Sequence, residues 1–217
     1  MFSIDSKDFS CPKKKLAREE TIISPYREYF SYQLPAEKQY WTMCGQCATV
    51  SGVPIIDTEF NHIISSNLIS QDQFFGIEIN KDIHKVNTAA YPGIKFINGD
   101  FYSTLLEHSN NDNFNPGIIN VDLLKTPQYG ASTFGNIMHL ISKSGINNVM
   151  LIGNFLLRVY YNKEQDGNEI ASELKNNISY KISINTRNWK RRNQYYKYYG
   201  TGKSNTVLGS VIYYLKD

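Results

Sequence analysis

The alternation of short apolar runs with helical segments through the middle of the chain most constrains its fold. The apolar runs are rich in β-branched and aromatic residues, which is typical of buried strands. They span 73–80, 94–101, 117–124 and 148–157, and the helical segments between them span 81–90, 102–109 and 130–145. Strands that alternate with helices form parallel βαβ units. The sequence therefore predicts an α/β sheet with helices on both faces.

The same pattern extends toward both ends of the chain. A helix at 58–70 precedes the strand at 73–80, so we expect residues 38–45 to form the first strand. A helix at 167–177 precedes the last two strands, which are predicted at 179–186 and 205–215. No helical pattern separates those two strands. They are therefore expected to pair antiparallel as a long hairpin joined by the segment 187–204.

Composition is that of a globular chain with one main domain. The 217 residues are 41% hydrophobic and 20% charged, and no apolar run reaches the roughly 18 residues of a membrane-spanning helix. The N-terminus lacks the apolar core of a secretory signal, and three cysteines do not make a disulfide framework. We expect no membrane association, a cytoplasmic location, an N-terminal extension over 1–37 and one domain over 38–217.

Charge is distributed unevenly along the chain. Residues 181–217 hold eight of the 23 basic residues and one of the 20 acidic residues, which leaves 15 basic and 19 acidic residues before position 181. The body is thus acidic and the C-terminal segment strongly basic. Such a split favours a surface that faces a polyanion.

The segment "RNWKRRNQYYKYYGTGK" (187–203) interleaves cations with aromatic residues. Basic side chains contact phosphates and exposed aromatic rings stack on bases, so the segment predicts a nucleic-acid contact. The alternative is a solvated hairpin whose tyrosines pack on the sheet. The residues predicted to contact nucleic acid are Arg187, Trp189, Lys190, Arg191, Arg192, Tyr195 and Lys197.

Two acids lie at the carboxyl ends of successive predicted strands. Glu78 lies near the end of the run at 73–80, and Asp100 lies in the Gly-Asp pair near the end of the run at 94–101. Ligands of open α/β sheets bind beyond the carboxyl ends of the strands, where a carboxylate can accept hydrogen bonds from ribose hydroxyls. A turn that lets a ligand approach the backbone needs glycine, which Gly45 supplies and to which Gly52 can contribute. Both acids can instead be N-terminal acids of the helices that follow.

This order of elements and acids resembles the class I S-adenosylmethionine-dependent methyltransferase family. The resemblance covers about 38–217 and implies a Rossmann-like, seven-stranded, mostly parallel sheet closed by a C-terminal antiparallel hairpin. It also implies S-adenosylmethionine as the cofactor. The sequence "CGQCATVSG" (44–52) stands where the family has a glycine-rich G-x-G-x-G turn. The residues that the resemblance implies for the cofactor are Gly45, Gln46, Glu78, Ile79, Asp100 and Phe101.

Asp122 lies within the apolar strand 117–124, where a carboxylate is unfavourable unless it is paired. It is therefore either near a functional strand end or held by structural hydrogen bonds. The resemblance implies a substrate-facing motif in "INVDLL" (119–124), with Asp122 or Asn120 orienting the methyl acceptor. "NVDLLKTPQYG" does not match the motif of the DNA amino-methylating enzymes, and it contains no Pro-Cys nucleophile.

Cys44 and Cys47 have the Cys-x-x-Cys spacing of zinc and redox sites. Zinc sites need four ligands, but Cys11 is distant in sequence and the four histidines are scattered. A redox pair is also disfavoured, because no redox-fold pattern follows. We expect small residues that pack a tight turn, and no metal site. "GTGKSN" (200–205) lacks the glycine spacing and the following helix of a phosphate loop.

The sequence thus favours an S-adenosylmethionine-dependent methyltransferase that acts on nucleic acid. The alternative is a catalytically inactive module of the same fold that binds nucleic acid or a protein partner. A methyltransferase that acts on a small molecule or a protein is a further option.

Overall fold

The structure is a computed structural model that describes residues 12–123, 127–158, 189–196 and 206–216. It is an α/β fold with a seven-stranded mixed sheet in the order β3-β2-β1-β4-β5-β7-β6. The chain divides into two compact units, Met1–Thr104 and Leu105–Asp217. None of the described helices is long and apolar enough to cross a membrane.

The first unit contains three parallel strands, β1 (Gln39–Met43), β2 (Phe74–Glu78) and β3 (Lys95–Asn98). β1 pairs with β2 so that Met43 faces Ile77, and β2 pairs with β3 so that Glu78 faces Asn98. Both pairings place the carboxyl ends of the strands at one edge. The acids that the sequence put after β2 and β3 therefore belong to the same edge.

Short polar caps start the helices of this unit. α3 (Glu59–Ser65) begins after Thr58, whose hydroxyl accepts a hydrogen bond from the N–H of Asn61 at 3.2 Å. α4 (Lys81–Ala90) begins after Asn80, whose Oδ1 accepts from the N–H groups of Asp82 and Ile83. A 3-10 turn, η3 (Gln71–Gln73), precedes β2, and α5 (Phe101–His108) follows β3. Such caps satisfy N–H groups that the first helical turn leaves without partners.

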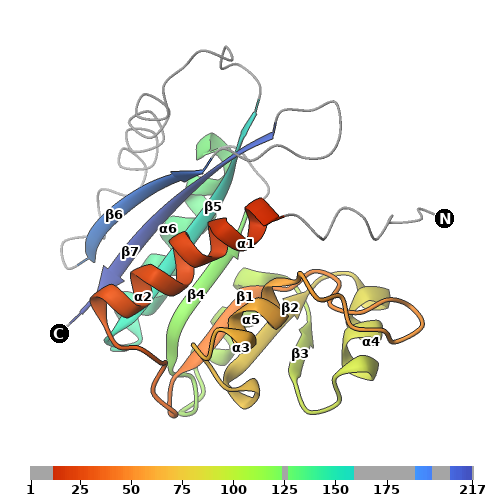
Figure 1. Ribbon diagram of the computed structural model, residues 1–217. Coiled ribbons are helices and arrows are strands. Elements are labelled where there is room, and N and C mark those ends of the chain that lie inside the picture. Colours follow the sequence, from red (N-terminus) through yellow and green to blue (C-terminus); the bar gives the residue numbers. More distant parts are fainter. Residues whose placement is uncertain (1–11, 124–126, 159–188, 197–205, 217) are drawn as a thin grey trace. The chain divides into compact units, whose positions relative to one another are not determined.

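A helical run precedes β1. Figure 1 shows α1 (Pro12–Arg18), the π-helical segment η2 (Glu19–Ile23) and α2 (Ser24–Tyr29) as one continuous red element. Ile22, Ile23 and Tyr26 are buried. The chain after the run is fixed by Gln73, whose Nε2 donates to the carbonyl of Pro35 at 2.6 Å. Part of the predicted N-terminal extension is therefore helical and has buried side chains.

The second unit contains β4 (Pro116–Asp122), α6 (Pro127–Lys143), β5 (Val149–Arg158), β6 (Trp189–Tyr196) and β7 (Thr206–Leu215). β4 and β5 are parallel, whereas β7 pairs antiparallel with both β5 and β6. The long β6 and β7 are the blue strands of Figure 1. The prediction of an α/β, mostly parallel sheet with antiparallel strands at the C-terminal end is confirmed.

One boundary prediction is wrong. The segment 187–204 was expected to join the last two strands, but β6 lies within it and pairs with β7 from Trp189 opposite Leu215 to Tyr196 opposite Leu208. β6 ends the order of the strands that the structure describes, and charged residues are compatible with a strand at the edge of a sheet. The predicted helix 167–177 and strand 179–186 lie outside the described residues.

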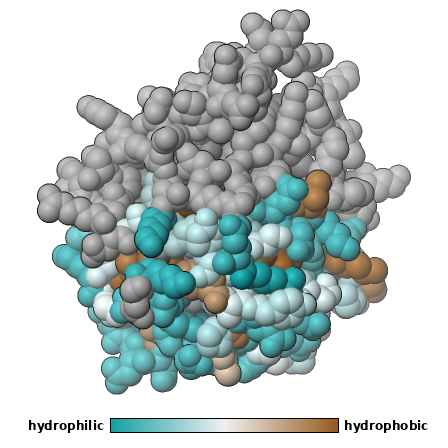
Figure 2. Space-filling model, turned by 60° about the vertical axis from the view of Figure 1, so that its left-hand side comes forward, coloured by the Kyte–Doolittle hydropathy of each residue, from teal (hydrophilic) through white to brown (hydrophobic). Residues whose placement is uncertain are grey.

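Aromatic side chains fill the core of each unit. In the first unit, Phe60 packs on Phe74 and Tyr91, with ring centroids 4.9 and 4.8 Å apart. In the second unit, Phe134 contacts Phe155 and Tyr213. The described surface on the face shown in Figure 2 is mostly hydrophilic, with separate hydrophobic patches.

Gly76, on β2, lies at a tightly packed position. A Cβ at this position would lie 2.8 Å from Cys44 Cβ, 2.9 Å from a Phe74 ring carbon and 2.9 Å from a Phe96 ring carbon. We expect Gly76→Ala to lower the free energy of unfolding by about 1–3 kcal/mol through overpacking. Urea denaturation measures the change. Gly93→Ala is the control, because a Cβ there meets no atom within 4 Å, and an equal loss in both variants would contradict the packing argument.

Candidate functional site

The candidate site is the edge where β1, β2 and β3 of the first unit end. The N–H of Cys44 continues the ladder beyond β1 by donating to the carbonyl of Ile77 at 2.8 Å. The carbonyl of Glu78 accepts from the N–H of Gly99 at 3.2 Å and from Asn98 Nδ2 at 2.7 Å. These bonds tie together the segments that carry the predicted cofactor residues.

Glu78 is partly buried at the end of β2. Its Oε1 accepts a 2.7 Å hydrogen bond from the N–H of Asn80, which holds the carboxylate against the turn into α4. Burial raises the pKa of Glu78 above its ordinary value, while the N–H groups of Asn80 and Ile79 act in the opposite direction. A desolvated carboxylate at a strand end is typical of a binding position, because a ligand can replace the water that the group has lost.

Asp100 has a structural bond of its own. Its Oδ1 accepts from the N–H of Ser103 at 2.9 Å and from the Ser103 hydroxyl at 3.0 Å, so it caps α5. Asp100 is exposed, and the following Phe101 is buried. The alternative that the sequence left open, a helix N-terminal acid, therefore describes Asp100, and the cap leaves its other oxygen, Oδ2, for further bonds.

The turn after β1 leaves space in front of its backbone. A Cβ at Gly45 would have no heavy atom within 4 Å. The neighbouring Gln46 donates from Nε2 to the carbonyl of Ala48 at 2.7 Å. At the ends of the adjacent strands, Ile79 is 72% exposed and Met43 is 36% exposed. Large apolar side chains at a strand end beside a carboxylate offer both surfaces that a nucleoside needs.

Asn87, on α4, holds this turn in place and is fully buried. Its Oδ1 accepts from the N–H of Cys47 at 2.8 Å, and its Nδ2 donates to the carbonyl of Gly45 at 2.9 Å. The hydroxyl of Tyr91, just after α4, donates to the carbonyl of Cys47 at 3.4 Å. Sequence reasoning missed Asn87. The one signal in the sequence was an amide among the buried positions of an amphipathic helix.

Beyond Cys47 the chain makes a compact turn. Ala48 forms a bridge with Pro54, and the N–H of Gly52 donates to the carbonyl of Thr49 at 2.8 Å. Gly52 has φ +82°, a conformation that residues with a side chain rarely adopt. Glycine at position 52 is thus required by this local turn.

Cys44 and Cys47 are both buried free thiols. Their Sγ atoms lie 3.2 Å apart. The hydrogen bond to Cys47 and burial raise the pKa of Cys44 well above its ordinary value, and the nearby charges of Glu59 and Glu78 add to the rise. Nowhere in the described part of the chain do three His, Cys, Asp or Glu side chains gather as metal ligands.

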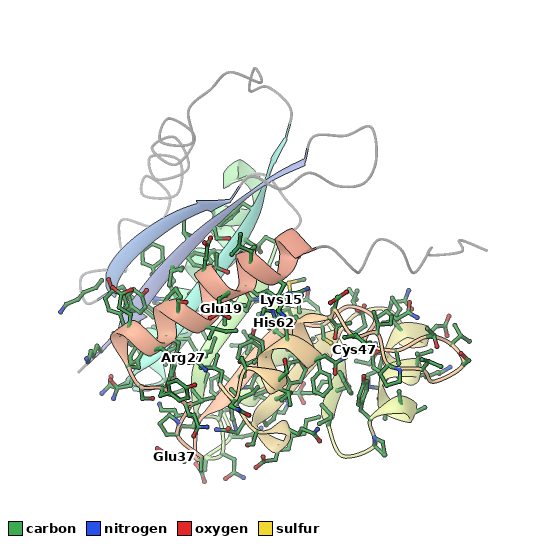
Figure 3. The ribbon with its side chains drawn as sticks, viewed as in Figure 1. Lys15, Glu19, Arg27, Glu37, Cys47 and His62 are labelled. Atoms are coloured by element: carbon green, nitrogen blue, oxygen red, sulfur yellow. The ribbon has the colours of Figure 1, made fainter. Side chains whose placement is uncertain are left out.

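A second polar cluster lies behind β1. Glu59 Oε1 accepts hydrogen bonds from the hydroxyls of Tyr40 at 2.8 Å and Thr42 at 2.6 Å. Figure 3 shows His62 beside Glu19 of the N-terminal helical run, and His62 Nε2 lies 3.7 Å from Glu19 Oε2. Burial lowers the pKa of His62, and the charge of Arg18 lowers it further. Glu59 thus joins α3 to β1, and His62 joins α3 to the helical run.

The two predicted catalytic residues lie on β4 in the second unit. Asn120 is 2% exposed, and its Oδ1 accepts a 2.9 Å hydrogen bond from Asn154 on β5. Asn154 in turn accepts from the Ser210 hydroxyl on β7 at 2.6 Å. Asn120 thus belongs to a buried network across three strands, whereas Asp122 is partly exposed at the end of β4.

The predicted nucleic-acid residues fall on or beside β6. Trp189 is 7% exposed, and its Nε1 donates to the hydroxyl of Ser142 on α6 at 2.9 Å. Burial and this hydrogen bond give Trp189 a structural role. Lys190 is exposed. Arg191, Arg192 and Tyr195 lie on β6, but the structure does not describe their side chains. Arg187 and Lys197 lie outside the described residues.

Comparison with known proteins gives matches at the level of structure. No family model and no curated protein matches the sequence. Among solved structures, precorrin-6y C5,15-methyltransferase from Geobacter metallireducens GS-15 aligns with a TM-score of 0.50 and 7% identity over 100% of this chain and 94% of its own. The complex of LepI with SAM (S-adenosylmethionine) aligns with a TM-score of 0.50 and 8% identity over 90% of this chain. This chain spans about half of the LepI chain, 47%.

A third structure, protein LPL1258 from Legionella pneumophila str. Philadelphia 1, aligns with a TM-score of 0.55 and 8% identity over 96% of this chain and 86% of its own. At these identities the likeness shows the fold alone, which is a Rossmann-like α/β fold with a mostly parallel sheet.

The clamp by Asn87 gives a direct test of the turn. Asn87→Ala removes the partner of the buried N–H of Cys47 and one donor to the carbonyl of Gly45, so we expect the free energy of unfolding to fall by about 1–3 kcal/mol. Chemical denaturation followed by circular dichroism measures it. Asn110→Ala is the control, because Asn110 Nδ2 donates to a helix carbonyl at an exposed position. A loss at Asn87 no larger than at Asn110 would contradict the clamp.

Proposed function

We propose that this protein is an S-adenosylmethionine-dependent methyltransferase that acts on nucleic acid. The observation that carries the cofactor part is the combination at the end of β2 of a desolvated carboxylate, Glu78, with an exposed apolar side chain, Ile79. A nucleoside presents hydroxyls on its ribose and an apolar face on its base. The pair at 78 and 79 matches both surfaces.

The residues of the first unit fit this cofactor. Only one oxygen of Glu78 is engaged by the N–H of Asn80, and a carboxylate can accept about four hydrogen bonds, so ribose hydroxyls can be accommodated. The open space at Gly45 allows a ligand to approach the backbone, and Asn87 keeps that backbone fixed. When bound, S-adenosylmethionine supplies an electrophilic methyl group on a sulfonium. The task of the protein is then to hold the acceptor in line with that methyl group.

Asp122 is the residue that we propose to orient the methyl acceptor, because it is partly exposed at the end of a strand. Asn120 is buried and hydrogen-bonded to Asn154, so we propose that it supports β4. The burial of Asn120 also favours the second candidate, an inactive module of this fold, because it removes one of the two predicted acceptor-orienting groups from solvent.

The nucleic-acid part of the proposal is supported by charge. Three consecutive cations, Lys190, Arg191 and Arg192, lie on β6, and the segment 181–217 carries eight basic residues against one acid. Among the described strands β6 is the last in the sheet order, and an edge strand can present its charges to a partner. Phosphate groups are the partner that this charge favours.

Titration of the protein with S-adenosylmethionine and with its demethylated product tests the cofactor site. We expect both to bind, and Glu78→Gln to weaken binding about tenfold or more, because it removes a charged acceptor. Isothermal titration calorimetry measures the affinities. Glu107→Gln, an exposed acid on α5, is the control. A wild type that gives no heat and no thermal shift would favour the inactive module, and unchanged affinity in Glu78→Gln would remove the role of Glu78.

Glu78→Gln has a second expected effect, on stability. Because burial raises the folded-state pKa of Glu78, the ionised carboxylate disfavours the fold. This penalty is absent below the unfolded-state pKa of Glu78 and develops as the pH rises through its folded-state pKa. The unliganded variant should therefore be slightly more stable than the wild type at neutral pH and should lose that advantage in acid. Higher stability with weaker binding is expected of a binding residue and not of a structural one.

Salt-dependent binding to oligonucleotides tests the substrate class. We expect the affinity for single-stranded DNA or RNA to fall steeply with salt, and the variant with Lys190, Arg191 and Arg192 all changed to Ala to bind more weakly. Its log–log salt slope should be smaller by about 0.7 for each phosphate that the variant no longer neutralises. Fluorescence anisotropy measures both quantities. Lys81→Ala/Lys85→Ala on α4 is a control for loss of positive charge. A flat salt dependence in the wild type would point to a small-molecule or protein substrate.

A further inference from the structure

The two thiols of the turn after β1 are in contact. Cys44 and Cys47 are buried and free, and their Sγ atoms lie 3.2 Å apart. A disulfide has an S–S length of about 2.05 Å, so bond formation needs the sulfurs to approach by roughly 1.1 Å. The backbone of the turn has therefore already brought the two side chains together.

The hydrogen bonds of the turn are compatible with loss of both thiol hydrogens. The carbonyl oxygen of Gly45 lies 3.3 Å from Cys44 Sγ and 3.5 Å from Cys47 Sγ, so a thiol that does not donate to the other sulfur can donate to this carbonyl. It also accepts from Asn87 Nδ2 at 2.9 Å. After oxidation the thiols no longer donate, but the amide of Asn87 still satisfies this carbonyl. The carbonyl of Gly45 would thus keep a donor after oxidation.

The backbone is held at both cysteines. Cys44 is fixed by its N–H bond to the carbonyl of Ile77 and by Gly76, whose missing Cβ makes room for Cys44 Cβ. The N–H of Cys47 is held by Asn87. The approach of the sulfurs therefore falls on the intervening Gly45 and Gln46, and a Cβ at Gly45 would meet no heavy atom within 4 Å.

We propose that Cys44 and Cys47 are a site of reversible thiol–disulfide exchange, with glutathione disulfide or a similar small disulfide as the co-reactant. Closure of the bond reshapes the turn that carries Gly45 and Gln46. The exchange itself is independent of the proposed function, whereas its effect on cofactor binding rests on that function.

The exchange conserves atoms and electrons at each step. Because both thiols are buried, the turn has to open locally to admit the small disulfide. One cysteine, as its thiolate, then attacks a sulfur of the small disulfide, and a mixed disulfide forms as one glutathione thiolate leaves. The second cysteine attacks the protein sulfur of that mixed disulfide and expels the other glutathione thiolate. The protein loses two hydrogens and two electrons, and two glutathione thiols are formed with the two protons. The high pKa of Cys44 makes its thiolate scarce at neutral pH, so the reaction should quicken as the pH rises.

The experiment uses the full chain with Cys11→Ser, so that only Cys44 and Cys47 can react. Folded protein is equilibrated in glutathione buffers of increasing oxidised fraction at pH 8.5. Equilibrium is approached both from the reduced chain and from chain oxidised in denaturant and refolded. Mass spectrometry and thiol counting follow the species. Cys11→Ser/Cys44→Ser, which keeps one thiol of the pair, is the control.

We expect an internal disulfide in the folded chain, reached from both directions and absent in the control. Two results together would overturn the proposal. The initially reduced chain would stay reduced in the most oxidising buffer, and the chain oxidised in denaturant would become reduced or stay unfolded. Accumulation of the mixed disulfide alone would also overturn it.

The effect on the turn is read by calorimetry with S-adenosylmethionine. We expect the oxidised chain to bind on the order of tenfold more weakly than the reduced chain, a typical size for coupling between sites. If the reduced chain does not bind the cofactor, the proposed function is wrong. The thiol–disulfide exchange is tested independently by mass spectrometry. Equal affinity of the reduced and oxidised forms would overturn the claim that closure reshapes the turn.

Discussion

The parallel ladder of β1, β2 and β3 is the constraint on which the candidate site depends. Its register places Cys44 beside Ile77, and Glu78 beside Asn98 and Gly99. Cys44 can approach β2 this closely because Gly76 has no side chain. A Cβ at position 76 would lie 2.8 Å from Cys44 Cβ. The turn after β1 and the acid after β2 are thus held at one edge by backbone bonds and close packing.

One buried amide extends this order into the loop. Asn87 bonds both an N–H and a carbonyl of the turn, so the conformation of residues 45–47 is set by α4 and not by a glycine-rich sequence. This offers a physical reason why the chain can differ from the glycine-rich turn of the class I methyltransferases. The same clamp holds two thiols in contact, and it links the redox state of the turn to the position of its backbone.

The polar residues of the chain divide by their bonds into structural and accessible groups. Asp100 caps α5, Trp189 donates to Ser142, and Asn120 belongs to a buried network with Asn154 and Ser210. Each of these groups has a partner that explains its type. Glu78 differs because burial raises its pKa while an exposed apolar residue stands beside it. The cofactor proposal therefore rests on Glu78 more than on Asp100.

The sequence by itself determined the alternation of strands and helices, because hydrophobic periodicity and capping residues such as Asn80 act locally. It also placed Glu78 and Asp100 after neighbouring strands. It could not locate β6 within 189–196, because an edge strand is defined by its pairing with β7 and not by its own apolar pattern. The clamp by Asn87, the contact of Cys44 with Cys47 and the burial of Asn120 were likewise decided only by tertiary structure. The clamp and the buried network join residues that are distant in sequence. The contact of the two thiols depends on side-chain orientations that a local sequence pattern does not determine.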